Sequence, residues 1–301
     1  MKKNSIQSKK RYLHQRLTGL TRQTGVNEPL TKAERALKRS ARDEGISIVT
    51  FMDSVTTCAW VPCDRFFCRT GTDGTGEVTT NGQAVGSKIV GHNPSTFSTE
   101  TQVTAGKRPT WDSTNDCLQF TKASENFLQG TQVLDVYDCF ATFVVDVPTG
   151  TGILFYNSVQ TNPGFVNWGI GIGLSDLNNS GNNFLAVVAG GGFLVQSGTP
   201  PVFANRKCLI GFRRNRVSTT ENSFLYVDRV VAGSFPLTIT PASIVTTGGY
   251  QLGGLVRSTG VAPDRHVTGK IYGGFLFNGN PSDELRARTE RWLQYYYSLL
   301  S

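Results

Sequence analysis

The stretch GKIYGGFLFNGNPSDELRARTERWLQYYYSLL, residues 269–300, changes its hydrophobic pattern halfway along. Its first part, 269–277, is a short apolar run of the kind that forms a buried strand. Ser282 can then cap a helix with its hydroxyl, and the next two residues are acidic, which suits the positive end of a helix dipole. The stretch therefore predicts a strand followed directly by a helix over 282–300.

The predicted helix has two different faces. Its apolar residues recur three or four positions apart, as on one side of an amphipathic helix: Leu285, Thr289, Trp292, Leu293, Tyr296, Leu299 and Leu300. The polar side carries Arg286, Arg288, Glu290, Arg291 and Gln294. We expect Leu285, Trp292, Leu293 and Tyr296 to be buried against the β-rich body. A solvent-exposed Trp292 would instead indicate an interface with another subunit.

Most of the preceding chain has the pattern of short strands and turns. Among 301 residues, 33 are glycine and only 17% are charged, which is typical of a turn-rich β protein. ISIVTFM (46–52) and CFATFVVDV (139–147) are strand candidates, and NWGIGIGL (167–174) alternates strictly. Asp73-Gly74 and Asn81-Gly82 are hairpin-type turn pairs. Roughly ten to twelve strands at this spacing predict a two-sheet sandwich or jelly roll.

The positive charge is confined to the first 45 residues. The chain has a net charge of +8, and residues 1–45 hold 12 basic and 4 acidic residues, so the remainder is neutral. LTKAERALKRSARDEG (30–45) has helical character. Such an arm favours an anionic partner: nucleic acid, an acidic protein surface or a membrane surface. The expected contact residues are Lys9, Lys10, Arg11, Arg16, Arg35, Lys38, Arg39 and Arg42.

The histidines and cysteines form no metal or nucleophile motif. The three histidines, His14, His92 and His266, have no cysteine or serine near them in such a motif, and we expect them in solvated loops. The cysteines lack the paired CxxC spacing of a zinc site, so reduced, mostly buried thiols are expected, with a metal or disulfide role as the alternative: Cys58, Cys63, Cys68, Cys117, Cys139 and Cys208.

Two further features have a functional and a structural interpretation. DLNNSG (176–181) begins like a calcium loop, but its twelfth position is Val187, which excludes an EF-hand. A polar turn is the favoured interpretation, and a calcium or glycan loop is the alternative, with Asp176, Asn178, Asn179 and Asn182 as its residues. The tryptophans could stack on sugar rings, but core positions are favoured for all of them: Trp60, Trp111, Trp168 and Trp292. No cofactor is otherwise indicated.

The order of segments resembles a known family. TNGQAVGSKIVG (80–91), AGKRPTWDSTNDCLQFTKASENFL (105–128), SFLYVDRVVAGS (223–234) and the closing strand and helix are similar to the concanavalin A-like (laminin-G-like) jelly rolls, in the version found in bacteriophage structural proteins. The likeness extends over about residues 55–300. The closing motif is matched by Gly269, Ile271, Phe275, Phe277, Ser282, Glu284, Arg286, Trp292, Leu293 and Tyr296.

The resemblance implies an all-β fold: a two-sheet antiparallel jelly-roll sandwich at 46–301, with the terminal helix packed on it and a basic, partly helical arm at 1–45. One position departs from the family. Arg229 stands where the hairpin usually has glycine, so we expect a turn of different geometry there.

The resemblance also bears on catalysis. Glucanases on this fold use an ExDxxE arrangement of carboxylates, and this chain has none. Glu77, Glu100 and Glu125 stand isolated in turn-like contexts. We therefore expect that the protein is not an enzyme.

Together these features predict a bacteriophage virion structural protein, a decoration or appendage of head or tail. The arm would anchor it to other virion proteins in a homo-oligomeric or capsid or tail assembly, after assembly in the host cytoplasm, and the family likeness implies host-glycan binding. The alternative is a viral coat protein whose arm binds packaged nucleic acid, with affinity that falls steeply with salt. No secretory signal and no apolar run of membrane-spanning length is present, so no membrane partner is expected.

Overall fold

The computed structural model describes residues 58–92, 97–131, 138–148, 152–157, 170–174, 185–189, 192–196, 205–215, 223–235, 249–254 and 266–297. The description below concerns the compact unit formed by Ala59–Gly91 and Phe97–Ser301. The predicted strand at 46–52 lies outside the described residues.

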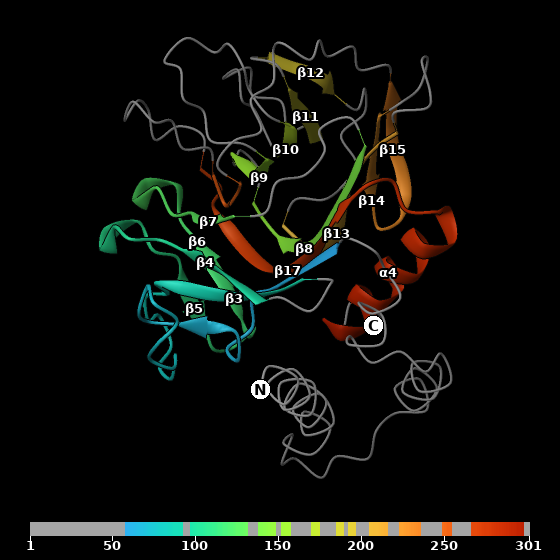
Figure 1. Ribbon diagram of the computed structural model, residues 1–301. Coiled ribbons are helices and arrows are strands. Elements are labelled where there is room, and N and C mark those ends of the chain that lie inside the picture. The colour runs from blue at the N-terminus through green and yellow to red at the C-terminus, as the bar shows by residue number, and fades with distance from the viewer. Residues whose placement is uncertain are drawn as a thin grey trace, which may run out of the picture. The chain divides into compact units, whose positions relative to one another are not determined.

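The described chain is an all-β fold with a helix near its C-terminus (Figure 1). Its strands are β1 (Cys58–Pro62), β2 (Cys68–Arg69), β3 (Ser87–His92), β4 (Phe97–Thr101), β5 (Thr110–Asp112), β6 (Cys117–Phe120), β7 (Leu128–Gly130), β8 (Cys139–Asp146), β9 (Ile153–Asn157), β10 (Ile170–Leu174), β11 (Leu185–Ala189), β12 (Gly192–Gln196), β13 (Lys207–Arg214), β14 (Ser223–Val227), β15 (Val230–Phe235), β16 (Tyr250–Leu252) and β17 (Gly269–Asn278). Short 3-10 turns lie at Ala105–Lys107 and Lys122–Ser124, and α4 spans Asp283–Tyr296.

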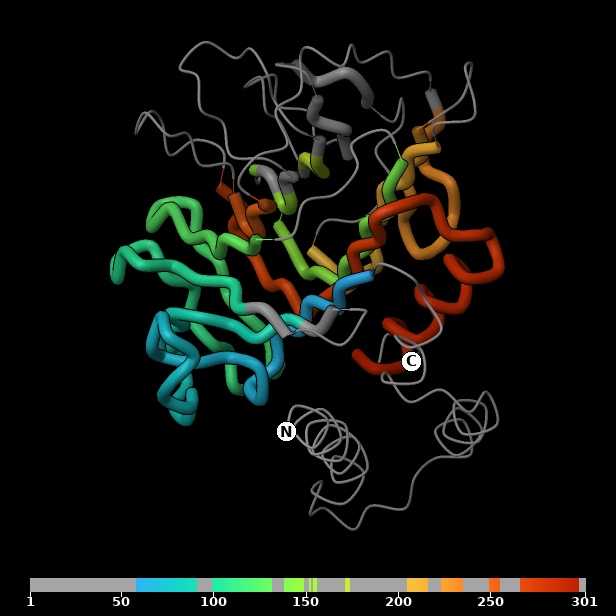
Figure 2. Tube along the Cα trace, in the orientation of Figure 1, coloured from blue at the N-terminus to red at the C-terminus, as the bar shows by residue number. Residues whose placement is uncertain are grey.

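The strands form an antiparallel two-sheet sandwich, as the sequence predicts. In one sheet, β8 pairs with β13 on one side and with β17 on the other, and β14 and β15 continue beyond β13. In the other, β10 pairs with β9 and β11, and β16 joins β9 to β7. The two ends of the described chain meet, because β1 lies beside β17 (Figure 2).

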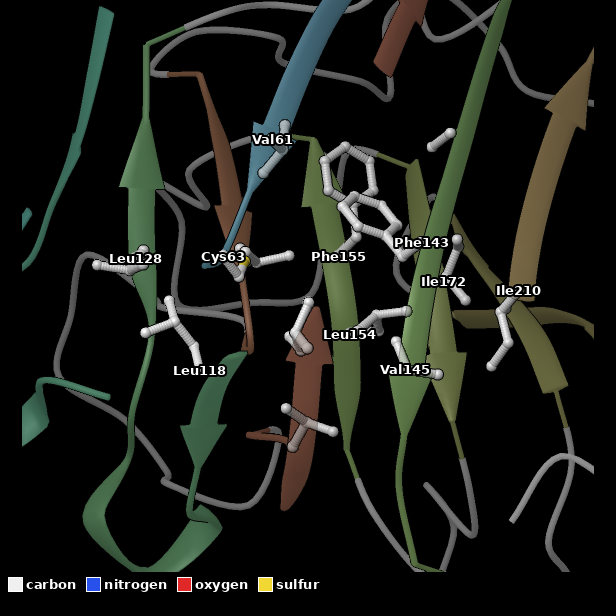
Figure 3. Packing of buried hydrophobic residues seen from close by; sticks show 14 of the residues in the cluster. Val61, Cys63, Leu118, Leu128, Phe143, Val145, Leu154, Phe155, Ile172 and Ile210 are labelled. Carbon is white, nitrogen blue, oxygen red and sulfur yellow. The ribbon is translucent and has the colours of Figure 1, made fainter. Parts of the chain in front are cut away.

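Strand β8 is mostly apolar because both of its faces are covered. Alternate residues point to opposite sides of a strand. Phe143 and Val145 belong to the main core, where the Phe143 ring meets Phe155 of β9 with centroids 5.4 Å apart (Figure 3). Phe140 lies on the other face with Phe277, where α4 packs. The helix thus covers a second apolar layer outside the sandwich.

The start of α4 confirms the predicted cap. The backbone N–H of Leu285 donates to the Ser282 hydroxyl at 3.2 Å, and Leu293 is fully buried. The predicted burial against the body is confirmed only in part for Leu285, Trp292 and Tyr296, which are half-buried. These three side chains lie at the margin of the helix–sheet contact, so one side of each still meets solvent.

The predicted polar face of α4 is also only partly correct. Glu290 is 0% exposed and Gln294 is 8% exposed. The charged side of the helix packs against β14, where the Arg286 guanidinium lies 4.4 Å from the centre of the Tyr226 ring. Arg286 donates to Glu290 at 2.8 Å, and burial raises the pKa of Glu290 although Arg286 lowers it. An ion pair thus allows a charged side chain to enter the helix–sheet contact.

The hairpin between β14 and β15 contradicts the predicted change of turn. Val227 pairs with Val230, so Asp228 and Arg229 form a two-residue turn with φ values of 48° and 73°. Positive φ at both positions defines the same primed turn that glycine favours. Asp228 stabilises this turn through two hydrogen bonds with Leu209. Its backbone N–H donates to the Leu209 carbonyl oxygen at 2.8 Å, and its carboxylate accepts from the Leu209 N–H at 2.9 Å. These bonds fix Asp228 within the turn, and Arg229 follows it in the left-handed region.

Candidate functional site

The residues that the sequence singles out as contact sites lie outside the described part of the chain. This holds for the eight basic residues of the arm, Lys9, Lys10, Arg11, Arg16, Arg35, Lys38, Arg39 and Arg42, and for the loop residues Asp176, Asn178, Asn179 and Asn182. Trp168 and His14 also lie outside it. Within the described residues, no group of histidine, cysteine, aspartate and glutamate could hold a metal ion.

A buried ionic cluster joins three strands and corrects the interpretation of Glu100. This residue is not in a turn: it lies in β4 directly opposite Lys88 of β3, and the Lys88 Nζ is 2.8 Å from its Oε2. The Tyr250 hydroxyl of β16 donates to its other oxygen. Lys88 and Glu100 are both 0% exposed. Burial lowers the pKa of Lys88, but the Glu100 carboxylate outweighs it, so the net shift is upward.

The ionic cluster is sealed from solvent, so it has a structural role. No substrate could reach groups that are completely buried. Burial, with the Glu100 charge next, also holds the pKa of Tyr250 well above its ordinary range. Side chains from β3, β4 and β16 meet here, and their pairing fixes the position of these strands relative to one another.

A second cluster of polar residues lies between the turn after β1 and the end of α4, and part of it reaches the surface. Asp64 begins the turn after β1, and its Oδ2 accepts a hydrogen bond from the Tyr296 hydroxyl of α4 at 3.2 Å. Asp116, in the turn between β5 and β6, accepts from the Arg65 backbone N–H at 2.8 Å and from the Trp111 indole N–H at 3.0 Å. We call Asp64 and Asp116 the carboxyl pair.

The two members of the carboxyl pair have different environments. Asp64 is only 4% exposed, whereas Asp116 is half-buried. Burial raises the pKa of Asp64 to about 7, and the charge of Asp116 acts in the same direction, against the hydrogen bonds from Tyr296 and the Phe66 backbone. Asp64 can therefore gain or lose a proton near neutral pH, which is characteristic of residues at functional sites.

Aromatic rings surround the carboxyl pair. The Trp292 and Tyr296 rings stack with centroids 4.8 Å apart and an interplanar angle of 17°, and both are half-buried. The fully buried Trp60 meets each of them edge-on, at 5.8 and 5.7 Å. The predicted core position is confirmed for Trp60 and Trp111, whereas Trp292 keeps part of its ring at the surface.

The histidine and cysteine predictions have different outcomes. His266 is 4% exposed, so the expected solvated position is wrong: it packs between elements of the body, with its ring 6.0 Å from that of Phe127. All six cysteines are buried and free, as expected. Burial raises the pKa of Cys58, Cys63 and Cys208 to about 12, which removes the thiolate needed for reactivity.

The sequence contains little that could have indicated the carboxyl pair. Asp64 stands in CDRFF and Asp116 in NDC, and neither belongs to a recognisable motif. Asp64 and its partner Tyr296 are 232 residues apart in the chain. Only the pairing of β1 with the closing strand brings them together.

Comparison with known proteins gives structural matches alone. No family model matches the chain, and no curated protein matches it. A Trypanosoma rangeli sialidase in complex with sialic acid has a TM-score of 0.47 at 12% identity, over 89% of this chain and 39% of its own. A GH54 α-L-arabinofuranosidase has 0.41 at 12%, over 78% and 63%. The NanB sialidase of Streptococcus pneumoniae has 0.36 at 18%, over 52% and 24%. This chain thus spans about two fifths of the Trypanosoma sialidase.

These matches correct the prediction that the protein is not an enzyme. The named structures with similar β architecture are sialidases and an arabinofuranosidase, which are enzymes. The prediction, which was drawn from the missing glucanase motif, is therefore wrong. At such low identity and TM-score, the likeness transfers no activity to this chain. Within the described residues, no helix is long and apolar enough to cross a membrane.

Proposed function

We propose that this protein is a component of a bacteriophage particle, on the head or tail, whose β body recognises glycans of the host surface. The family resemblance of the ordered sequence segments supports the phage context. The antiparallel sandwich with its packed terminal helix has the form that this resemblance implies. Other virion proteins are its expected partners, and the virion is its expected location.

The observation that carries glycan recognition is the surface made by Trp292, Tyr296 and Asp116, with the buried Asp64 beneath it. Sugars present apolar C–H faces together with hydroxyl groups. Half-buried aromatic rings suit the first, and carboxylates accept hydrogen bonds from the second. Binding sites often combine aromatic walls with a few fixed polar groups in this way. The stacked Trp292 and Tyr296 rings, 4.8 Å apart, stand beside the carboxyl pair.

Glycan binding by the full chain tests this surface. A panel that includes sialic acid- and arabinose-bearing glycans would be screened, and the bound glycan titrated against Asp116→Asn, which keeps the shape of a half-buried side chain. We expect at least roughly tenfold weaker binding, the loss of about one good hydrogen bond to a charged group. The matched control is Glu284→Gln, which changes an exposed acid on α4, the helix that carries Trp292 and Tyr296. Equal affinity of both variants, or no binding by the wild type, would refute the proposed surface.

The basic arm supports attachment to an acidic partner within the particle. The arm has 12 basic and 4 acidic residues and so carries the whole net charge of +8, whereas the body is neutral. Removal of the arm therefore leaves the charge of the displayed body unchanged. Deletion of residues 1–45 should abolish incorporation into particles while the body stays folded. Salt-sensitive DNA binding that disappears with the arm would instead favour the coat-protein alternative.

A further inference from the structure

The last turn of α4 contacts the body through a carboxyl group, and the Lys207 ammonium of β13 donates to the Tyr297 carbonyl just beyond it. The Tyr296 hydroxyl donates to Asp64 Oδ2 at 3.2 Å, and the Phe66 backbone N–H donates to Asp64 Oδ1 at 3.2 Å. The backbone N–H of Asp64 itself also stabilises the carboxylate. None of these donors is a cation, so an ionised Asp64 would be buried without a countercharge.

The groups around Asp64 disfavour its charge. Asp116 faces it from the β5–β6 turn, Tyr296 from α4 and Tyr297 from the position just after α4. The Tyr296 hydrogen bond favours the charged form, but burial and the Asp116 charge outweigh it. Cys63 and Cys68, from its own segment, are buried and uncharged. The guanidinium of the adjacent Arg65 lies toward the Phe66 ring, 5.9 Å from its centre. Exposure to water therefore stabilises an ionised Asp64, because hydration lowers the free energy of its charge.

We propose that Asp64 is a proton-controlled anchor for the last turn of α4. With a neutral carboxyl, the turn stays docked, and the Tyr296 ring remains stacked on Trp292. When the carboxyl loses its proton, opening of the turn hydrates the charge and separates Tyr296 from the body. The device concerns the fold and holds whether or not the neighbouring surface binds a glycan.

The direction of the pH effect follows from the pKa of Asp64 in the two states. Burial raises this pKa from 3.8 to about 7 in the docked state, whereas an opened turn restores an ordinary value. The docked state therefore binds the proton more tightly, and docking is strongest below the opened-state pKa. It weakens as the pH rises toward 7 and stays weak above that. The opening equilibrium should increase up to about tenfold per pH unit in this window.

Hydrogen exchange of the full-length protein tests the anchor. Protection factors, corrected for the intrinsic pH dependence of exchange, would be measured for residues 293–297 between pH 5 and pH 8. We expect them to fall by at least roughly tenfold across this range, while those of the central strand β8 remain constant. Protection of the last turn that is constant with pH would overturn the proposal.

Two variants separate the anchor from a general effect of pH. Asp64→Asn cannot ionise, so protection of the last turn should become independent of pH. Asp116→Asn removes the neighbouring charge, so the midpoint should move to lower pH. A carbon-13 titration of the Asp64 carboxyl in the wild type provides a reading that needs no variant. A midpoint below pH 5 there, or an unchanged pH dependence in Asp64→Asn, would also refute the anchor.

Discussion

Replacing Lys88 by methionine should be among the most destabilising single changes in the described part of the protein. The substitution keeps most of the side-chain volume but removes the cation that faces Glu100. Both side chains are 0% exposed, and their charged atoms are 2.8 Å apart. Glu100 would then remain in the interior with the Tyr250 hydroxyl as its hydrogen-bond donor.

The size of the effect can be derived from this distance. At 2.8 Å and an effective dielectric constant of about 20, the attraction is about 6 kcal/mol. Dehydration of the two charges already offsets part of that attraction in the wild type. Removal of one member of a buried pair costs about 3–5 kcal/mol, because the other charge is left uncompensated. Since domains are stable by only about 5–15 kcal/mol, this loss is a large fraction of the total.

Urea unfolding of the full chain, followed by tryptophan fluorescence, measures the cost. The matched control is Lys107→Met, which removes the ion pair with Glu125 from a partly exposed site (42% and 29% exposed) and should cost less than about 1 kcal/mol. A combined Lys88→Met, Glu100→Leu and Tyr250→Phe protein removes every polar member of the cluster. It should recover much of the lost stability, because no unpaired group remains.

Two results would refute this reasoning. If Lys88→Met costs no more than Lys107→Met, water reaches Glu100 and the cluster is not dry. If the triple variant is no more stable than the single one, the loss comes from altered packing rather than from an unpaired charge.

Three further changes test the local structure. Ser282→Ala should cost about 1 kcal/mol of unfolding free energy, because the Leu285 N–H loses its cap, and thermal unfolding against an Ala287→Ser control checks this. Arg229→Gly should stabilise the protein by about 1 kcal/mol, because glycine adopts the observed φ of 73° without strain; an unchanged or lower denaturation midpoint would count against this. Gly273→Ala should be strongly destabilising, because φ is 147° and the added Cβ would collide with the Tyr297 hydroxyl; normal stability, measured by calorimetry, would show that the helix end can move away.

The closing helix shows how far a local pattern can predict structure. The cap at Ser282 depends on residues within one turn, and the observed bond to Leu285 confirms it. Burial of each helix face depends on the elements that pack against it, and the periodicity of the sequence carries no information about those elements. Glu290 is therefore buried, contrary to the prediction, because Arg286 pairs with it and packs on Tyr226 of β14.

The two carboxyl clusters were beyond the reach of the sequence for a similar reason. Glu100 is isolated along the chain, but the register of β3 with β4 places Lys88 directly opposite it. Asp64 lies in an ordinary turn until the last turn of α4 covers it. Neither environment is encoded by neighbouring residues, so the burial of neither carboxyl group could be expected from the sequence.

The sequence by itself determined the β class of the protein, the buried β8 strand, the capped helix at its end and the concentration of positive charge in the first 45 residues. These properties follow from composition and from periods of two and 3.6 residues, which act over short distances. Tertiary structure alone decided which carboxylates lose contact with water, which aromatic rings stay at the surface and that Arg229 adopts the glycine-type turn. Each of these depends on contacts between segments distant in the chain, and burial changes the free energy of a charge far more than any local preference does.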